Sequence, residues 1–339
     1  MQERYPMKLR GYTRAAIWGG ARLRREWGKR LPDISENVAE SWELTVRERE
    51  NSVVQNGKFA GRTLGEVLRA PTRWDMVTPD WDGGRFPLLV KLLDAGSDLS
   101  VQVHPDDAYA SWVEHDTGKT EMWVILEAEP GARLVCGLKE GIRRADFCDA
   151  VAEGRVGEVL RYRTVRAGDI CFIPAGMVHA IGGGILLVEI QENSDLTYRV
   201  YDYDRVDKDG NKRPLHTEKA CEAVRAFSDD EVEAMRFSTA HPGAEADGGT
   251  LLAACDFFTV RSRRLGGRHG ADLDGSFDGF VAPGGFSYLL VTDGAIMLTA
   301  PTDGAFAPVM LARGESAFLP AGMGAYRVDG CGAWLEVGV

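Results

Sequence analysis

The sequence predicts a mainly β protein made of two similar barrels with a few short helices. Short apolar runs bounded by glycine, proline or aspartate are typical of strands, and examples lie at Phe86–Leu93, Met122–Leu126, Ile170–Ile173 and Ile185–Ile190. Many short strands favour a barrel or a sandwich. An internal repeat predicts two barrels of this kind, because GDICFIPAGMVHA at 168–180 is similar to GESAFLPAGMGAY at 314–326.

Helical signals are few and local, and they lie near Thr63–Leu68, Arg144–Leu160 and Thr217–Met235. The second of these accounts for the longer interval between strand and turn motif in the first copy of the repeat. A glycine-rich, poorly patterned stretch follows the third. We therefore expect an N-terminal catalytic domain over residues 1–236 and a C-terminal domain over residues 237–339.

Composition narrows the class of partner. A net charge of −11 argues against a broad nucleic-acid surface, because phosphate backbones are bound by clustered lysine and arginine. The longest apolar run, around Ile185–Val188, is far short of the ~18 residues that span a bilayer, so we expect neither membrane insertion nor secretion. Six scattered cysteines without a CxxC pair indicate reduced thiols in a cytoplasmic protein. The composition is compatible with an anionic small-molecule substrate if the lysine and arginine residues that contact it are clustered at one site.

Three segments of the first barrel carry residues of the kind that bind metals. Gln102 and His104 are two residues apart, as are Lys119 and Glu121, so each pair shares one face of a strand. The turn Gly168-x5-Pro174-x-Gly176-x2-His179 delivers one histidine inward. Two neutral imidazoles and a carboxylate suit a catalytic zinc site, although the same set also suits iron or manganese.

The second copy of the repeat lacks these ligands. Ala325 stands where the first copy has His179, and counting back from the matched strands puts Phe286 opposite Glu121. The sequence therefore predicts metal chemistry in the first barrel alone.

Two further charged residues are expected near the metal. A hairpin turning at residues 182–184 would bring Glu189 opposite His179, where it could orient the imidazole or act as an acid or base. Arg199 lies on a strand predicted to return to the same barrel, and arginine suits contact with phosphate.

At this point the residues show a family resemblance. The turn that carries His179 resembles the second motif of the cupin superfamily, whose fold is a double-stranded β-helix, or jelly-roll. The chain as a whole resembles the short form of the type I mannose-6-phosphate isomerases. The matching stretches, which run from residue 10 to residue 220, are IWGG (17–20), AESWE (39–43), FPLLVKLLDA (86–95), LSVQVHPDD (99–107), GKTEMW (118–123), the His179 turn, ENSDLTYRVYDYDR (192–205) and RPLH (213–216).

The resemblance implies reversible interconversion of mannose 6-phosphate and fructose 6-phosphate with one zinc ion per chain, in the N-terminal barrel. It implies three metal ligands, His104, Glu121 and His179, and a fourth, Gln102, that many members use. Arg199 falls on the active-site arginine of the family. The positions that line the family's pocket are Lys119, Glu189, Ser100, Lys91, Trp18 and Glu40.

The expected chemistry moves a proton between C2 and C1 through an enediol, and the sequence offers Lys119 and Glu189 as the base, with Lys119 slightly favoured. Two alternatives stay open. One is another metal-dependent cupin enzyme, such as a dioxygenase or a different sugar isomerase. The other is a regulatory cupin that binds a sugar phosphate without catalysis. The oligomeric state is not predicted.

Overall fold

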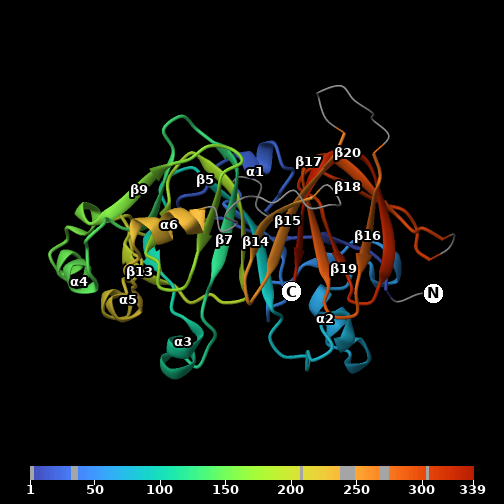
Figure 1. Cartoon of the computed structure of the whole chain (residues 1–339), viewed down its shortest axis with the longest axis horizontal. Helices are drawn as coiled ribbons and strands as arrows, with labels where there is room; N and C mark the ends of the chain where they lie inside the picture. The colour runs from blue at the N-terminus through green and yellow to red at the C-terminus, as the bar shows by residue number, and fades with distance from the viewer. Residues whose placement is uncertain (1–3, 32–36, 207–208, 237–248, 267–274, 303–304) are drawn as a thin grey trace. The chain divides into compact units, whose positions relative to one another are not determined.

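The computed structural model describes residues 4–31, 37–206, 209–236, 249–266, 275–302 and 305–339 (Figure 1). Its elements are mostly antiparallel strands, which confirms the mainly β prediction. The chain divides into two compact units. Unit 1 comprises Met1–Tyr12, Trp42–Leu89 and His241–Val339, and unit 2 comprises Thr13–Ser41 and Val90–Ala240. Among the helices of the described residues, none combines the length and apolar character needed to cross a bilayer.

The two units are not contiguous segments of the chain. Unit 1 contains N-terminal residues because β1 (Met7–Arg10) pairs with β19 (Ser316–Leu319) on one side and β4 (Val53–Val54) on the other. The compact units therefore differ from the predicted division into 1–236 and 237–339, which stays a prediction. The segment that begins at residue 237 lies outside the described residues.

Unit 2 contains most of two sheets. The first has the strand order β10-β7-β12-β5-β3-β2 and the second β13-β6-β11-β8-β9. The strands are β2 Tyr12–Arg14, β3 Glu40–Leu44, β5 Leu88–Ala95, β6 Val101–Val103, β7 Glu121–Ala128, β8 Arg133–Leu138, β9 Leu160–Thr164, β10 Ile170–Ile173, β11 His179–Ile181, β12 Ile185–Glu192 and β13 Tyr198–Tyr201.

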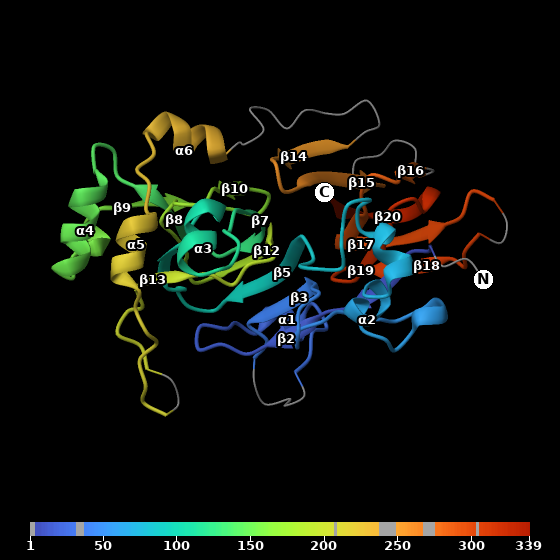
Figure 2. The same ribbon diagram turned by 90° about the horizontal axis from the view of Figure 1, so that it is seen from below.

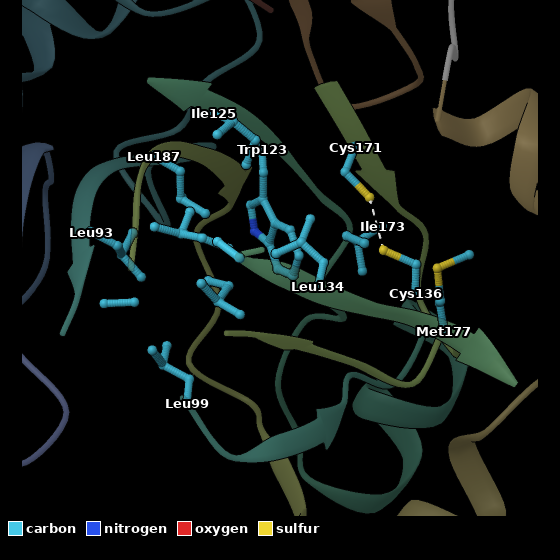
Figure 3. Packing of buried hydrophobic residues seen from close by; sticks show 14 of the residues in the cluster. Leu93, Leu99, Trp123, Ile125, Leu134, Cys136, Cys171, Ile173, Met177 and Leu187 are labelled. Carbon is cyan, nitrogen blue, oxygen red and sulfur yellow. Dashed lines mark hydrogen bonds between the residues drawn. The ribbon is translucent and has the colours of Figure 1, made fainter. Parts of the chain in front are cut away.

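Alternation along the strands decides which side chains enter the space between these sheets. Val101 and Val103 point away from it and join an apolar cluster with Phe147 of α4 (Arg144–Ala152) and Ala220 of α5 (Thr217–Ala223). These two helices lie side by side (Figure 1 and Figure 2). A second cluster fills the interior from both sheets and includes Leu93, Trp123, Leu134, Ile173 and Leu187 (Figure 3). Side chains that alternate with the outer cluster, among them Gln102, therefore face the interior.

The helices are shorter than the sequence predicts. α4 ends at Ala152, because a 3-10 turn (Val156–Glu158) follows and Leu160 already belongs to β9, so the prediction of helix up to Leu160 is wrong. The helix predicted over Thr217–Met235 is two helices, α5 and α6 (Asp229–Arg236). Two N-termini carry reciprocal side-chain caps, that of α6 between Ser228 and Glu231 and that of α2 (Leu64–Leu68) between Thr63 and Glu66. The other helices are α1 (Arg22–Arg25) and α3 (Asp107–Val113), with 3-10 turns at Gly57–Phe59 and Pro71–Met76.

A disulfide joins Cys148 of α4 to Cys221 of α5. The expectation that every cysteine is a reduced thiol is wrong for this pair, because the two adjacent helices bring together residues 73 positions apart in the sequence. The remaining cysteines, Cys136, Cys171, Cys255 and Cys331, are not in a disulfide.

The IWGG motif lies against the buried carboxylate of Asp94. Asp94 is fully buried, and its carboxylate accepts hydrogen bonds from the backbone N–H of Arg22 at 2.6 Å and from Arg22 Nε at 2.8 Å. A Cβ on Gly20 would lie 2.4 Å from that carboxylate, so the close approach requires glycine. This close packing thereby fixes the backbone at Trp18, the second residue of the motif.

Unit 1 carries the second copy of the repeat in a nine-stranded sheet. Phe286 packs on Phe86 and Phe318 with ring centroids 5.3 and 5.0 Å apart, and Ala325 is exposed. Apolar rings thus occupy the position that the sequence matched to Glu121. The strands not yet given are β14 Thr250–Ala254, β15 Thr259–Leu265, β16 Phe277–Val281, β17 Ser287–Thr299, β18 Val309–Ala312 and β20 Gly324–Gly338.

Candidate metal centre and active site

The interior of unit 2 brings His104, Glu121 and His179 together. All three are buried, and one ligand atom from each lies within 4.8 Å of the others. Glu121 Oε1 is 3.5 Å from His179 Nε2, and Glu121 Oε2 is 3.7 Å from His104 Nε2. Glu121 begins β7 in one sheet and His179 begins β11 in the other. The described residues contain this one group of three metal-type ligands, and it lies in the unit of the first repeat.

Backbone carbonyls orient both imidazoles. His104 Nδ1 donates to the Leu196 carbonyl at 2.7 Å, and His179 Nδ1 donates to the Met177 carbonyl at 2.9 Å. With the proton on Nδ1, each ring presents its Nε2 lone pair toward Glu121. Burial, and then the nearby positive charge of Lys119, hold the pKa of His104 well below its usual value, and burial lowers the pKa of His179 to about 4. Both rings are therefore neutral at pH 7, as metal ligands must be.

Two lysines and a second carboxylate adjoin this group. Lys119 Nζ lies 2.7 Å from Glu121 Oε2 and 3.7 Å from Glu189 Oε1, and Lys91 Nζ lies 2.8 Å from Glu189 Oε1. Trp123 Nε1 donates to Glu189 Oε2 at 3.2 Å. Two carboxylates and two ammonium groups thus share one buried space, so their charges compensate one another.

Their pKa shifts follow from that arrangement. Burial raises the pKa of Glu121 to about 7, with the charge of Glu189 adding to the effect. Burial would also raise the pKa of Glu189, but Lys119 and Lys91 outweigh it and lower that pKa to about 2. Burial alone would lower the pKa of Lys119, and the charges of Glu121 and Glu189 reverse this and raise it. Lys119 is therefore an ammonium group wherever both carboxylates are ionised.

Gln102, Ser100 and Arg199 extend the site along the second sheet. Gln102 pairs in register with His179 on one side and with Arg199 on the other. Gln102 Nε2 lies 3.3 Å from His179 Nε2, and Ser100 Oγ lies 3.5 Å from Gln102 Oε1 and 3.3 Å from Arg199 Nε. Arg199 is half-buried, and its Nη1 donates to the Pro214 carbonyl. The strand return predicted for Arg199 is confirmed.

The predicted hairpin between Glu189 and His179 is wrong. β11 pairs with β6 and β8 in one sheet, whereas β12 pairs with β7 in the other, so the turn at residues 182–184 carries the chain between sheets. Glu189 stands opposite Trp123 and not opposite His179. It reaches the site all the same, because both sheets face one interior.

Sequence reasoning missed Trp123 and the two carbonyl acceptors. Trp123 holds Glu189, and its ring lies 5.5 Å from that of His179 at an interplanar angle of 74°. Its position two residues after Glu121 is a signal that could have placed it on the same face. No sequence signal points to the carbonyls of Leu196 and Met177, because they depend on loop conformation.

Trp18 and Glu40 are less closely tied to the site. Trp18 is buried in the interior apolar cluster, and its carbonyl accepts from the backbone N–H of Gly96. Glu40 is half-buried at the start of β3, which β5 separates from β12. Their role in binding substrate stays a prediction.

Comparison with known proteins identifies the family of this chain. The family model described as phosphomannose isomerase type I, catalytic domain, matches residues 7–129. Mannose-6-phosphate isomerase ManA of Bacillus subtilis is 38% identical over 263 residues, which are 77% of this chain and 80% of that protein. Mannose-6-phosphate isomerase of Streptococcus mutans is 37% identical over 262 residues, 77% of this chain and 79% of its own length.

Solved structures show the same fold. The crystal structure of mannose 6-phosphate isomerase from Bacillus subtilis superposes with a TM-score of 0.82 at 29% identity and covers 98% of this chain and 99% of its own. A variant of phosphomannose isomerase from Salmonella typhimurium superposes with a TM-score of 0.74 at 15% identity, covering 98% of each chain, and at that identity it supports the fold alone.

Proposed function

The chain belongs to the type I mannose-6-phosphate isomerase family and is an isomerase, and from this premise we propose that it interconverts mannose 6-phosphate and fructose 6-phosphate with one zinc ion per chain. The single observation that carries the proposal is the buried group of His104, Glu121 and His179 beside Lys119. A buried ligand set next to a lysine whose amine can become neutral can bind a hydroxy-carbonyl substrate and move a proton at the adjacent carbon.

The donor atoms of this group fit a divalent cation. His104 Nε2 and Glu121 Oε1 are buried and have no hydrogen-bond partner among the described residues. Leaving such atoms without a partner costs free energy, and a cation between them would supply what both lack. Gln102 would join as a fourth ligand if its amide oxygen turned toward His179.

Zinc suits this set because it accepts imidazole nitrogen and carboxylate oxygen and leaves a position for substrate. When bound, it acts as a Lewis acid that stabilises negative charge on a substrate oxygen, which is worth several kcal/mol. Iron and manganese would accept the same ligands, so metal analysis of the purified protein is the direct test of the zinc assignment.

Lys119 is the proposed base. Its Nζ would take the proton from one carbon of the substrate and return it to the other, with an enediol between the two steps, while a second proton would pass between the two substrate oxygens. This requires the neutral amine, which the two carboxylates oppose in the described structure. A metal cation bound by Glu121 would offset the negative charge of that carboxylate, which is the nearer of the two to Lys119. Glu189 is the weaker candidate, because Lys91 and Trp123 hold its carboxylate and its pKa is about 2.

Arg199, Ser100 and Lys91 are the proposed contacts for the anionic parts of the substrate. β6 lies between the strands of Arg199 and His179, and Arg199 is half-buried, which suits contact with the phosphate or the enediolate oxygen. We propose Trp18 and Glu40 as further substrate contacts on the basis of the family resemblance alone. A cytoplasmic location is likewise proposed from the sequence.

The proposal is tested with purified protein and mannose 6-phosphate in an assay coupled to detection of fructose 6-phosphate. We expect turnover that a chelator abolishes and added zinc restores. In deuterated water, an enediol route introduces deuterium at the carbon that exchanges its proton. A panel of other hexose phosphates measures preference. Protein that contains zinc yet converts none of the panel would contradict the proposed reaction.

A further inference from the structure

Two free thiols meet in the interior of unit 2 without any role in the proposed reaction. Cys136 of β8 and Cys171 of β10 are buried, and their sulfur atoms are 3.3 Å apart (Figure 3). β8 belongs to one sheet and β10 to the other, so the sulfur pair connects the two sheets across the interior. The separation is about 1.3 Å longer than a disulfide bond.

A small open pocket leads to both sulfurs. It is lined by the two cysteines together with apolar and charged side chains, namely Ile125, Leu134, Arg163, Val165, Asp169 and Ile170. The pocket is about large enough to hold a single water molecule, so it suits only the smallest polar molecules. Arg163, on the pocket wall, also pairs with Glu233 at 2.6 Å.

Each sulfur is one strand away from a residue of the metal centre. Cys136 stands directly opposite His179 in the ladder between β8 and β11. Cys171 stands directly opposite Trp123 in the ladder between β10 and β7, and Trp123 in turn packs on His179 and donates to Glu189. Movement of either cysteine is therefore passed on to the residues that position the metal ligands.

We propose that Cys136 and Cys171 are an oxidisable pair, converted by a small hydroperoxide to a disulfide that reversibly lowers the isomerase activity. The pair is already in contact, borders the pocket and lies in different sheets, so the bond would tie one sheet to the other. Thiols of cytoplasmic proteins that form disulfides are commonly redox-responsive.

The chemistry balances with hydrogen peroxide as oxidant. One thiolate sulfur attacks a peroxide oxygen, the O–O bond breaks, a sulfenic acid forms, and the departing hydroxide takes up a proton as water. The second sulfur then attacks the sulfenic sulfur, the S–O bond breaks, and hydroxide leaves as water with the proton of that thiol. Two thiols are oxidised and one peroxide is reduced. The hydrogen bond with Cys136, and burial, raise the pKa of the Cys171 thiol well above its usual value, so Cys171 suits the second step.

Formation of the disulfide lowers activity because the two sulfur atoms must move closer together. Closing a gap of roughly 1.3 Å shifts β8, β10 or both, and displacement of a reacting group by about 1 Å can cost on the order of 100-fold in rate. We expect a loss of about 10-fold in kcat, since the shift is shared between two sheets.

The test uses zinc-loaded full-length protein, reduced and then treated with hydrogen peroxide. After alkylation and non-reducing digestion, mass spectrometry identifies which cysteines are linked, and activity is measured in parallel before and after dithiothreitol. The expected result is a Cys136–Cys171 peptide pair that accumulates as activity falls and disappears as dithiothreitol restores activity. The peptide map does not depend on which sugar phosphate is the substrate, so it can fail or succeed independently of the proposed function.

Variants separate this pair from the other cysteines. Cys171→Ser should leave basal activity unchanged and abolish the response to peroxide, and Cys136→Ala provides the same test if that variant does not fold. Cys331→Ser, at an exposed thiol, and the double variant Cys148→Ser/Cys221→Ser should keep the response. Absence of the Cys136–Cys171 link at peroxide concentrations that oxidise Cys331 would overturn the proposal. A complete link with unchanged kcat would overturn its connection to the metal centre.

Discussion

Lys119 Nζ lies 2.7 Å from Glu121 Oε2, so the proposed base is paired with a proposed metal ligand. This contact links the two parts of the site. While Glu121 carries an uncompensated negative charge, Lys119 holds its proton. Positive charge at the ligand group would remove that attraction, so the proposed metal binding and the availability of the proposed base would be coupled through one carboxylate.

Replacement of Lys119 by Met tests the base. The change removes the amine and keeps a side chain of similar length, so we expect proton exchange at the substrate carbon to fall by about 10²–10⁴-fold while zinc content stays at one ion per chain. Lys212→Met, at an exposed ion pair, is the control and should match the unmodified enzyme. Retained turnover in Lys119→Met would remove Lys119 from the mechanism.

Replacement of His104 by Ala tests the metal. The variant loses one of three ligands, so we expect metal analysis to show loss of zinc and the coupled assay to show loss of activity. The matched control is His115→Asn, because His115 is exposed and its φ of 55° suits asparagine. A His104→Ala variant that is fully active without metal would contradict the metal-dependent reaction.

Glu189→Gln should shift the pH dependence of kcat. The charge of Glu189 contributes to the raised pKa of Lys119, so its removal lowers that pKa. Because the base must be neutral, activity rises with pH through this pKa, and the rise should move to lower pH in the variant. A pH–rate profile measures the shift. An unchanged profile would mean that the group titrating in the reaction is not Lys119.

Glu192→Gln should change the pH dependence of stability. Burial raises the pKa of Glu192 to about 7, above the value of about 4.3 expected for an unfolded chain. Between these values the unfolded state binds fewer protons, so the free energy of unfolding falls as pH rises through this window, by on the order of 1–3 kcal/mol. The glutamine variant should lose this fall. Thermal unfolding at pH 5 and pH 8 measures it, and identical pH dependence in both proteins would contradict the assignment.

Gly20→Ala should destabilise unit 2. Its Cβ would lie 2.4 Å from the buried carboxylate of Asp94, and forcing that contact costs about 1–3 kcal/mol. Gly157→Ala is the control, since its Cβ meets only an ordinary contact at 3.8 Å. Denaturant unfolding compares the two variants. Equal stability would show that the Asp94 loop adjusts without cost.

Local pattern was sufficient to place the metal-type side chains on shared faces, because a strand alternates its side chains regardless of its neighbours. Gln102 with His104, and Lys119 with Glu121, could be assigned to shared faces from their spacing. The same alternation placed Val101 and Val103 against the helices. The substrate, by contrast, came from family resemblance, because nothing in strand periodicity specifies a sugar phosphate.

Pairing between distant strands could not be inferred in the same way. The prediction for Glu189 assumed that a short turn joins paired strands, whereas here the chain crosses from one sheet to the other after residue 184. The end of α4 at Ala152 was missed because the chain turns after it and Leu160 begins a strand that tertiary pairing with β8 stabilises.

The sequence by itself determined the mainly β architecture, the three metal-type ligands and the family. Only the tertiary structure decided that Glu189 is held by Trp123 and Lys91, that Cys148 meets Cys221, and that Cys136 meets Cys171. The physical reason is that faces follow from local backbone geometry, whereas contacts across an interior depend on which strands pair and in what register.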